Sequence, residues 1–154
     1  MTATCRIGVD LGGTKIEAAV LNAQSETVAR LRQPTPVGDY TATVATIANL
    51  VLTLEQQVAE GVLPTGICTP GAINPATGLL KNANSTCLNG RPLQQDLEAA
   101  LARELRLAND ADCLAVSEAH DGTAAGVASV FGVILGTGVG GGCVIGGRLL
   151  RGVN

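Results

Sequence analysis

Two glycine-containing turns, each between two apolar segments, constrain the fold of this chain more than any other feature. The first turn, residues 12–13, separates two segments in which apolar and polar side chains alternate, residues 5–11 and 15–21. Such alternation is typical of strands with one buried face, and a glycine turn between two of them predicts a β-hairpin. The second turn, residues 136–142, lies between the apolar segments 127–135 and 143–145. The sequence therefore predicts two hairpins far apart in the chain, which could face one ligand.

Between the hairpins, the pattern alternates between helical and strand-like segments. Apolar side chains recur at helical spacing from Val44 to Val58, and Gly61 provides the stop. A second helix is expected to begin at Pro92 and to carry Leu93, Leu97, Ala100, Leu101 and Leu105 on one face. A third is expected to begin at Asn109-Asp110 and to end near Asp121-Gly122. Short strands are expected at residues 27–32, 66–69 and 106–108.

Residues 74–89 are rich in Asn, Gly, Thr and Pro and predict a long loop. Loops of this length inside a compact domain are usually functional. The cluster Lys81-Asn82-Ala83-Asn84-Ser85 is therefore a candidate polar lining for a ligand, and a set of solvated turn residues is the alternative.

Composition narrows the class of partner. The net charge is -3, and the sequence contains no run of basic residues. Binding to nucleic acid or to an anionic membrane requires such a positively charged cluster. The sequence shows no secretion signal and no apolar stretch that approaches a membrane span, and its five cysteines include no C-x-x-C pair. We therefore expect a cytoplasmic protein with reduced thiols that acts on a small molecule.

Glycine turns between antiparallel strands suit phosphate binding, because backbone N–H groups approach the anion without obstruction by a Cβ atom. Thr14 and Thr137 could each add a hydroxyl donor, and Lys15 could neutralise phosphate charge. Asp10, at the end of the first strand, is placed to hold Mg²⁺ through water. Gly13 is expected to have a positive φ, which a β-branched residue would oppose. For each turn taken alone, a plain hairpin without a ligand remains the alternative.

Residues 136–141 also satisfy the G-x-G-x-x-G fingerprint of dinucleotide-binding folds. That fold requires the glycines to open a helix after a strand, whereas residues 142–147 (GCVIGG) are poor helix formers and indicate a strand and a turn. No G-x-x-x-x-G-K-[ST] sequence is present either. We therefore reject a nicotinamide-binding unit and a P-loop.

Asp110 is the candidate general base. It lies in the polar segment LANDAD, residues 107–112, at a strand-to-helix junction where a carboxylate can face a ligand beyond the end of the strand. Asn109 and Asp110 are also favoured helix N-caps, so a purely structural role is the alternative, and both roles can coexist.

Together these motifs resemble the ROK family of sugar kinases. The matching segments are, in order, residues 8–17 (GVDLGGTKIE), 69–71 (TPG), 82–85 (NANS), 107–113 (LANDADC) and 136–142 (GTGVGGG). Residues 81–90 (KNANSTCLNG) look most like the bacterial fructokinase/mannokinase branch. The resemblance covers nearly the whole chain. It implies an α/β fold of the actin-like ATPase (ribonuclease H-like) type, with a mixed sheet flanked by helices.

The resemblance also implies roles for single residues. The family's first phosphate motif is matched by Asp10, Gly12, Gly13, Thr14 and Lys15, and its second by Gly136, Thr137 and Gly138. The catalytic aspartate is matched by Asp110. Positions that line the sugar pocket are matched by Gly71, Asn84 and Asn109. Glu118 lies in a typical Ser-Glu-Ala stretch, for which no role is assigned.

Two departures from the family pattern matter. Asp112 stands where the family usually has Asn, and a carboxylate near Asp110 should raise the coupled pKa values of the pair. The chain also stops at Asn154, ahead of the expected Glu-Trp-Gly-His-like sugar contacts, the Cys/His zinc site and most of the adenosine pocket. His120, the only histidine, does not replace that zinc site.

We expect residues 1–121 to form an amino-terminal domain with the first phosphate motif and the sugar loop. Residues 122–154 should open a second, incomplete domain with the second phosphate motif. The implied reaction moves the γ-phosphoryl group of ATP to a hexose hydroxyl, while Asp110 accepts the proton and Mg²⁺ and glycine amides stabilise the phosphoryl charge.

The expected ligands are ATP, Mg²⁺ and a hexose, and the expected assembly is a homo-oligomer, a dimer, without nucleic-acid or membrane partners. Two alternatives stay open. One is a truncated, non-catalytic sugar-binding fragment. The other is a sugar-responsive ROK regulator, although such regulators carry a helix-turn-helix ahead of the kinase-like part and this chain starts its first strand by Cys5. We expect the isolated 154-residue chain to be inactive.

Overall fold

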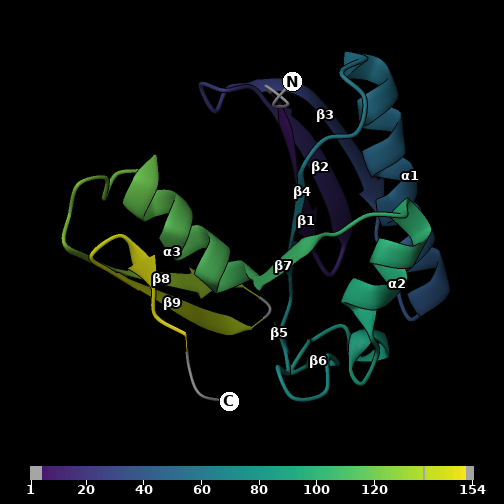
Figure 1. The fold of residues 1–154 in the computed structure, drawn as a ribbon. Helices are drawn as coiled ribbons and strands as arrows, with labels where there is room; N and C mark the ends of the chain where they lie inside the picture. Colours follow the sequence, from purple (N-terminus) through teal and green to yellow (C-terminus); the bar gives the residue numbers. More distant parts are fainter. Residues whose placement is uncertain (1–4, 137, 152–154) are drawn as a thin grey trace. The chain divides into compact units, whose positions relative to one another are not determined.

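The computed structural model describes residues 5–136 and 138–151, which form three sheets and the helices that flank them (Figure 1). The first elements are β1 (Arg6–Leu11), β2 (Lys15–Leu21), β3 (Thr27–Pro34), α1 (Tyr40–Val58), β4 (Thr65–Thr69), β5 (Ala72–Ile73) and β6 (Leu80–Lys81). They are followed by a 3-10 helix (Thr86–Leu88), α2 (Leu93–Leu101), β7 (Arg106–Asn109), α3 (Asp110–His120), β8 (Ser129–Leu135), β9 (Val139–Ile145) and β10 (Arg148–Leu149).

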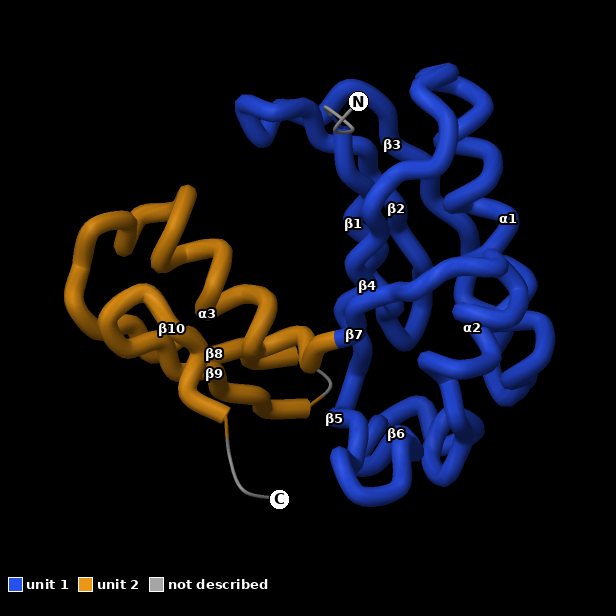
Figure 2. Tube along the Cα trace, viewed as in Figure 1, with its two compact units in different colours: residues 1–107 blue, residues 108–154 orange. Residues whose placement is uncertain are grey.

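The chain divides into two compact units, Met1–Leu107 and Ala108–Asn154 (Figure 2). The division falls within β7, earlier than the boundary predicted between residues 121 and 122. It lies there because α3 packs on β8 and β9 of the second unit. The two-domain division of the sequence analysis stays a prediction.

The first unit is built on a five-stranded mixed sheet with strand order β3-β2-β1-β4-β7. Strands β1 and β2 form the predicted antiparallel hairpin, with Leu11 opposite Ile16, and β3 adds a further antiparallel neighbour to β2. Strand β4 pairs in parallel with β1, with Asp10 opposite Cys68. The mixed sheet and the first hairpin of the sequence analysis are thus confirmed.

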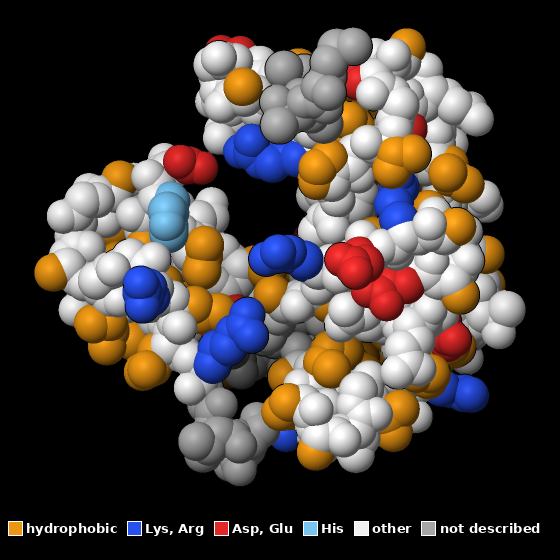
Figure 3. Space-filling view, in the orientation of Figure 1, with side chains coloured by type: hydrophobic (Ala, Val, Ile, Leu, Met, Phe, Trp, Pro, Cys, Tyr) orange, Lys and Arg blue, Asp and Glu red, His pale blue; other side chains and the backbone are white. Residues whose placement is uncertain are grey.

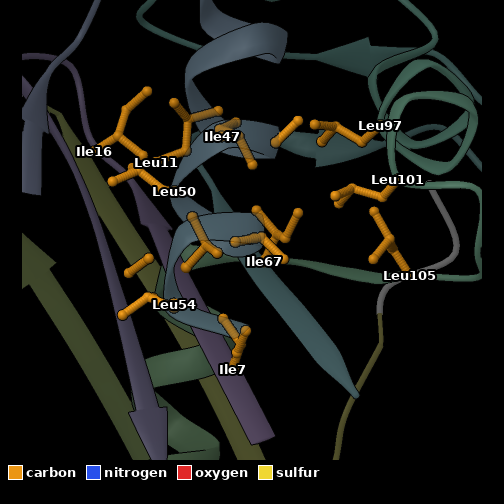
Figure 4. Packing of buried hydrophobic residues seen from close by; sticks show 14 of the residues in the cluster. Ile7, Leu11, Ile16, Ile47, Leu50, Leu54, Ile67, Leu97, Leu101 and Leu105 are labelled. Atoms are coloured by element: carbon orange, nitrogen blue, oxygen red, sulfur yellow. The ribbon is translucent and has the colours of Figure 1, made fainter. Parts of the chain in front are cut away.

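One face of this sheet is buried against α1 and α2. Alternate residues of β1 and β2 point into this layer, and Figure 4 shows them packed against apolar side chains from α1, β4 and α2. The fully buried members include Ile16, Ile47, Leu54 and Leu97. Burial of each such side chain contributes about 1.5–3 kcal/mol to the free energy of folding. Branched aliphatic side chains thus stabilise this core without the aromatic residues that are common in protein cores.

Helix α1 confirms the first predicted helix. It begins after Asp39, whose carboxylate accepts a hydrogen bond from the N–H of Ala42 at 2.9 Å. It ends at Val58, ahead of the predicted stop at Gly61, because Ala59 takes a left-handed conformation with φ 55°. None of the described helices is long and apolar enough to cross a membrane.

The second predicted helix was wrong at its end. Helix α2 stops at Leu101, because Ala102 takes a left-handed conformation with φ 53°. Leu105 is nevertheless buried, and its N–H donates to the carboxylate of Glu98 at 3.1 Å. Apolar spacing therefore indicated the burial of Leu105 correctly but not its secondary structure.

Residues 74–89 are more ordered than the predicted loop. Strands β5 and β6 pair antiparallel around its first part, with Ile73 opposite Leu80, and the 3-10 helix lies in its second part. The prediction of one long loop was therefore only partly right.

In the second unit, β8 and β9 form the predicted late hairpin, and β10 pairs with β9. The turn is shorter than predicted, because β9 already begins at Val139 and includes three of the glycines. An added Cβ at Gly142 would overlap the carbonyl oxygen of Ala111, and one at Gly140 would lie 3.1 Å from the Cβ of Ala111. Glycine on this face therefore lets α3 approach the sheet closely.

The opposite face of the β8–β9 hairpin is apolar and exposed. Its exposed apolar side chains are Phe131, Val133, Leu135, Val139 and Ile145. Figure 3 likewise shows apolar side chains at the surface of this unit. This apolar face, defined by those five residues, has no cover among the described residues.

Candidate functional site

The turn between β1 and β2 presents two backbone N–H groups. The N–H of Gly12 donates to the carbonyl of Lys15 at 3.0 Å and closes the turn. A Cβ atom at Gly12 would lie 2.8 Å from that carbonyl oxygen, so the close approach requires glycine. The N–H groups of Gly13 and Thr14 have no hydrogen-bond partner in the described part of the chain. The two residues are exposed, as is Lys15, and an anion could bind these N–H groups.

The expectation of a positive φ at Gly13 was wrong. Neither Gly12 nor Gly13 has a φ in the left-handed region. Apart from Gly13 itself and its two neighbours in the chain, the only atom of the described residues within 4 Å of an added Cβ at Gly13 is the Oγ of Ser85, at 3.9 Å. Gly12, rather than Gly13, is therefore the glycine that the backbone of this turn requires.

Asp10 lies at the end of β1 with its side chain exposed. Its Oδ1 accepts a hydrogen bond from the thiol of Cys68, which lies opposite it on β4, at 3.1 Å. The neighbouring strand therefore orients the carboxylate that the sequence analysis expects to hold Mg²⁺.

Gly71 supports the predicted sugar loop through its backbone. Its φ is +85°, and an added Cβ would overlap the carbonyl oxygen of Lys81 and lie 2.8 Å from the nitrogen of Ala83. Any other residue here would push the loop outward. Ala83 is buried, whereas the neighbouring Asn84 is exposed and available to a ligand.

The first unit brings the predicted phosphate turn and the predicted sugar loop together. Ser85 follows Asn84 directly, and its hydroxyl is the group that approaches Gly13. The structure gives this hydroxyl no hydrogen-bond partner among the described residues. Ser85 belongs to the polar cluster seen in the sequence, but its place beside the turn could not be predicted there.

Asn109 and Asp110 lie where β7 passes into α3, and both contribute to the start of the helix. The N–H of Ala111 donates to Oδ1 of Asn109 at 3.0 Å and to Oδ1 of Asp110 at 2.8 Å. The structural role considered for the pair is thus present. The other carboxylate oxygen of Asp110 has no partner in the described part of the chain, so it could still accept a proton.

The second glycine turn belongs to the second unit. The N–H of Gly136 donates to the carbonyl of Gly138 at 2.9 Å. Thr137, the predicted hydroxyl donor, lies outside the described residues. Gly140, the second residue of β9, comes near Asp110, because its added Cβ would lie 3.9 Å from Oδ1 of that carboxylate.

The structure shows the environments of two acidic residues of α3, Asp112 and Glu118. Burial raises the pKa of Asp112, the charge of Arg151 opposes this shift, and the charge of Asp110 adds to it. Glu118, for which no role was expected, accepts hydrogen bonds from the N–H and hydroxyl of Thr123 at 3.0 and 2.9 Å. Glu118 therefore stabilises the segment that follows α3.

The predicted site residues thus form two groups. Asp10, residues 12–15, Gly71 and Asn84 belong to the first unit, and Asn109, Asp110, Gly136 and Gly138 to the second. Over residues 5–136 and 138–151, no three His, Cys, Asp or Glu side chains cluster as metal ligands. Sequence reasoning missed Thr35 and Asn89, which bond to the turn and to the loop, because such contacts follow no periodic pattern.

Comparison with known proteins identifies relatives along the whole described chain. Residues 6–154 match the model of the ROK family. N-acetyl-D-glucosamine kinase of Vibrio cholerae is 45% identical over 148 residues, which are 96% of this chain and 48% of the relative. The chain therefore spans about half of the length of the relatives that it matches.

Solved structures show the same fold. The ROK hexokinase from Thermus thermophilus has a TM-score of 0.81 and 34% identity, and the match covers 97% of this chain and 49% of that chain. The ROK family glucokinase from Streptomyces griseus, solved with glucose and AMPPNP, has a TM-score of 0.82 and 29% identity over 96% of this chain and 46% of its own.

Proposed function

Because the chain belongs to the ROK family, whose actin-like ATPase fold it shares, we propose that it is part of an ATP-dependent sugar kinase. The protein would transfer the γ-phosphoryl group of ATP to a hexose hydroxyl. One observation carries the proposal: within the first unit, the Gly12–Thr14 turn with its two N–H donors lies beside Ser85 of the loop that holds Asn84. A phosphate donor and a sugar would thereby meet at one place.

The residues of the first unit fit a magnesium–nucleotide complex. Asp10 is exposed, and one of its carboxylate oxygens is held by Cys68, so the other is available to the water shell of an ion. When bound, Mg²⁺ would neutralise charge on the phosphate oxygens. The N–H groups of Gly13 and Thr14 would bind phosphate oxygens, and Lys15 would add a positive charge.

Asp110 is the proposed general base. Its Oδ1 is engaged by the N–H of Ala111, which fixes the orientation of the carboxylate at the start of α3. The second oxygen would accept the proton of the attacking sugar hydroxyl. Asn84, Asn109 and the backbone near Gly71 would bind other hydroxyls of the sugar, since amide groups both donate and accept hydrogen bonds.

Two observations favour different sugars. Residues 81–90 resemble the fructokinase/mannokinase branch, which favours fructose or mannose, and we take these as the first candidates. The 45% identity to the N-acetyl-D-glucosamine kinase of Vibrio cholerae favours N-acetyl-D-glucosamine as the second.

A coupled assay of ADP release by the full-length protein tests both the proposed kinase activity and the proposed order of sugars. Fructose, mannose, glucose and N-acetyl-D-glucosamine are compared by kcat/KM with ATP and Mg²⁺. We expect fructose or mannose to exceed N-acetyl-D-glucosamine about tenfold or more, which corresponds to about 1.4 kcal/mol of transition-state stabilisation. The reverse order would select the second candidate. A protein that phosphorylates none of the four, although it binds a sugar, would instead be a non-catalytic sugar-binding protein.

A further inference from the structure

We propose that Thr35 is a positioning residue for the phosphate-binding turn, an inference that rests on the proposed function. Thr35 follows β3 directly, and Pro34 and Pro36 flank it. It lies outside the segments whose motifs match the ROK sugar kinases. In its proposed role, Thr35 orients the turn and does not contact the phosphate itself.

Two hydrogen bonds tie Thr35 to the turn. Its hydroxyl donates to the carbonyl oxygen of Gly12 at 2.7 Å, and its N–H donates to the carbonyl oxygen of Thr14 at 3.0 Å. Strand β3 is separated from β1 by β2 in the sheet, so Thr35 reaches the turn past the first residue of β2. The residue is half-buried, which strengthens both bonds relative to exposed ones.

The bond from the Thr35 hydroxyl to the Gly12 carbonyl also orients the N–H of Gly13, because of the geometry of the peptide unit. The carbonyl of Gly12 and the N–H of Gly13 belong to one planar, trans peptide unit, in which the two groups point in opposite directions. A hydroxyl that holds the carbonyl on the side of Thr35 therefore holds the N–H of Gly13 on the other side. That N–H is one of the two that have no partner among the described residues.

The bond also removes a repulsion. A carbonyl oxygen turned toward a phosphate would repel its negative charge, whereas a carbonyl bonded to Thr35 is kept away from it. Thr35 thus presents the positive end of this peptide dipole to an anion without touching the anion itself.

The flanking prolines make Thr35 well suited to this task. Each proline has a restricted φ and no N–H, so Thr35 carries the only backbone donor of residues 34–36. Restriction of the chain before folding lowers the entropy that is lost when the two hydrogen bonds form. The anchor is therefore arranged in advance of ligand binding.

The test uses Thr35→Val in the full-length kinase, since valine keeps the shape of threonine and removes its hydroxyl. We expect the KM for ATP to rise about fivefold and the KM for the sugar to stay unchanged, in line with the loss of one neutral hydrogen bond. Thr35→Ser, which restores the hydroxyl, should return the KM for ATP to the wild-type value. Thr53→Val is the matched control, because the Thr53 hydroxyl also donates to a backbone carbonyl, that of Asn49 at 2.7 Å, on α1.

The outcomes are distinct. An unchanged KM for ATP in a folded Thr35→Val protein would overturn the inference and leave the proposed function standing. Equal increases in both KM values, with no recovery in Thr35→Ser, would show a general structural role and also overturn it. If circular dichroism shows that Thr35→Val is unfolded, Thr35→Ala, which adds no methyl group at the hydroxyl position, is judged by the same two KM values. A wild type without kinase activity would overturn the proposed function and the inference with it.

Discussion

The side chain of Asn89 bonds to both backbone groups of Ala83. Its Nδ2 donates to the Ala83 carbonyl at 2.9 Å, and its Oδ1 accepts from the Ala83 N–H at 2.8 Å. Because Ala83 is buried, these backbone groups would otherwise lack water as well as a protein partner. The backbone just before Asn84 is thus fixed by a residue six positions later.

Asn89→Ala should therefore destabilise the sugar loop. Loss of both bonds leaves two buried backbone groups unsatisfied, and we expect the free energy of unfolding to fall by about 2 kcal/mol in urea titrations. The KM for the sugar should rise while the KM for ATP stays constant. Asn49→Ala, at an exposed position of α1, is the control and should change neither quantity. Equal effects of the two variants would contradict the role of Asn89.

Asp110→Asn should separate catalysis from folding. The amide oxygen can still accept the N–H of Ala111, so the start of α3 should be preserved, while the proton acceptor is lost. In the full-length protein, we expect kcat to fall by about 10²-fold or more and sugar binding by thermal shift to remain. Asp112→Asn serves as the neighbouring control and should keep most of the activity. Wild-type turnover in Asp110→Asn would eliminate this residue as the base.

Glu55→Ala should destabilise the first unit, because it leaves the charge of Arg103 unpaired. Arg103 forms an ion pair with Oε1 of Glu55 at 2.5 Å, and that oxygen also accepts the N–H of Leu63 at 2.7 Å. Both side chains are mostly buried, so removal of the carboxylate should cost about 3 kcal/mol of unfolding free energy. The double variant Glu55→Leu/Arg103→Met should recover the part of this loss that comes from the unpaired charge of Arg103, whereas the N–H of Leu63 lacks its side-chain partner in both variants. Glu104→Ala, at an exposed position, should change stability little, and a similar loss there would point to another cause.

Asp112→Asn should stabilise the chain at neutral pH. Burial raises the pKa of Asp112 above its ordinary 3.8, against the opposing charge of Arg151 and with a smaller contribution from Asp110, so the folded state binds this proton more tightly than the unfolded state. The ionised carboxylate therefore costs stability above its folded pKa, and the cost disappears as the pH falls below 3.8. In urea titrations from pH 7 to pH 3, the midpoint of the Asp112→Asn variant should exceed that of the wild type near pH 7 only. A difference that grows toward low pH would contradict the raised pKa of Asp112.

The apolar face of the β8–β9 hairpin should make the isolated 154-residue chain self-associate. Phe131 is 70% exposed and Leu135 80% exposed, and neighbouring side chains extend the same surface. Light scattering should show a mass that increases with concentration, and Phe131→Ser/Val133→Thr should reduce it. Leu52→Ser, at an exposed position of α1, is the control and should leave association unchanged. A monodisperse wild-type monomer would contradict the prediction.

Periodic patterns made much of the fold predictable. The β1–β2 hairpin and α1 were found because alternation and helical spacing report directly which side chains are buried. Glycine gave a weaker signal, since the same residue permits a tight turn and a close helix–strand contact. The run from Gly140 to Gly142 was therefore assigned to a turn although it belongs to β9. The bonds of Thr35 and Asn89 could not be predicted, because they depend on how distant segments meet in space.

The glycines that let α3 approach β9 also bear on how the hairpin is aligned. A shift of β9 along β8 by two residues would keep every side chain on its own face and restore the same backbone pairing, so hydrogen bonds alone do not distinguish the two alignments. One such shift would, however, place Val144 where Gly142 now lies against the backbone of Ala111 and Asp112. The close contact at Gly142 thus excludes a shift in this direction, and in the observed alignment Gly140 lies near Asp110.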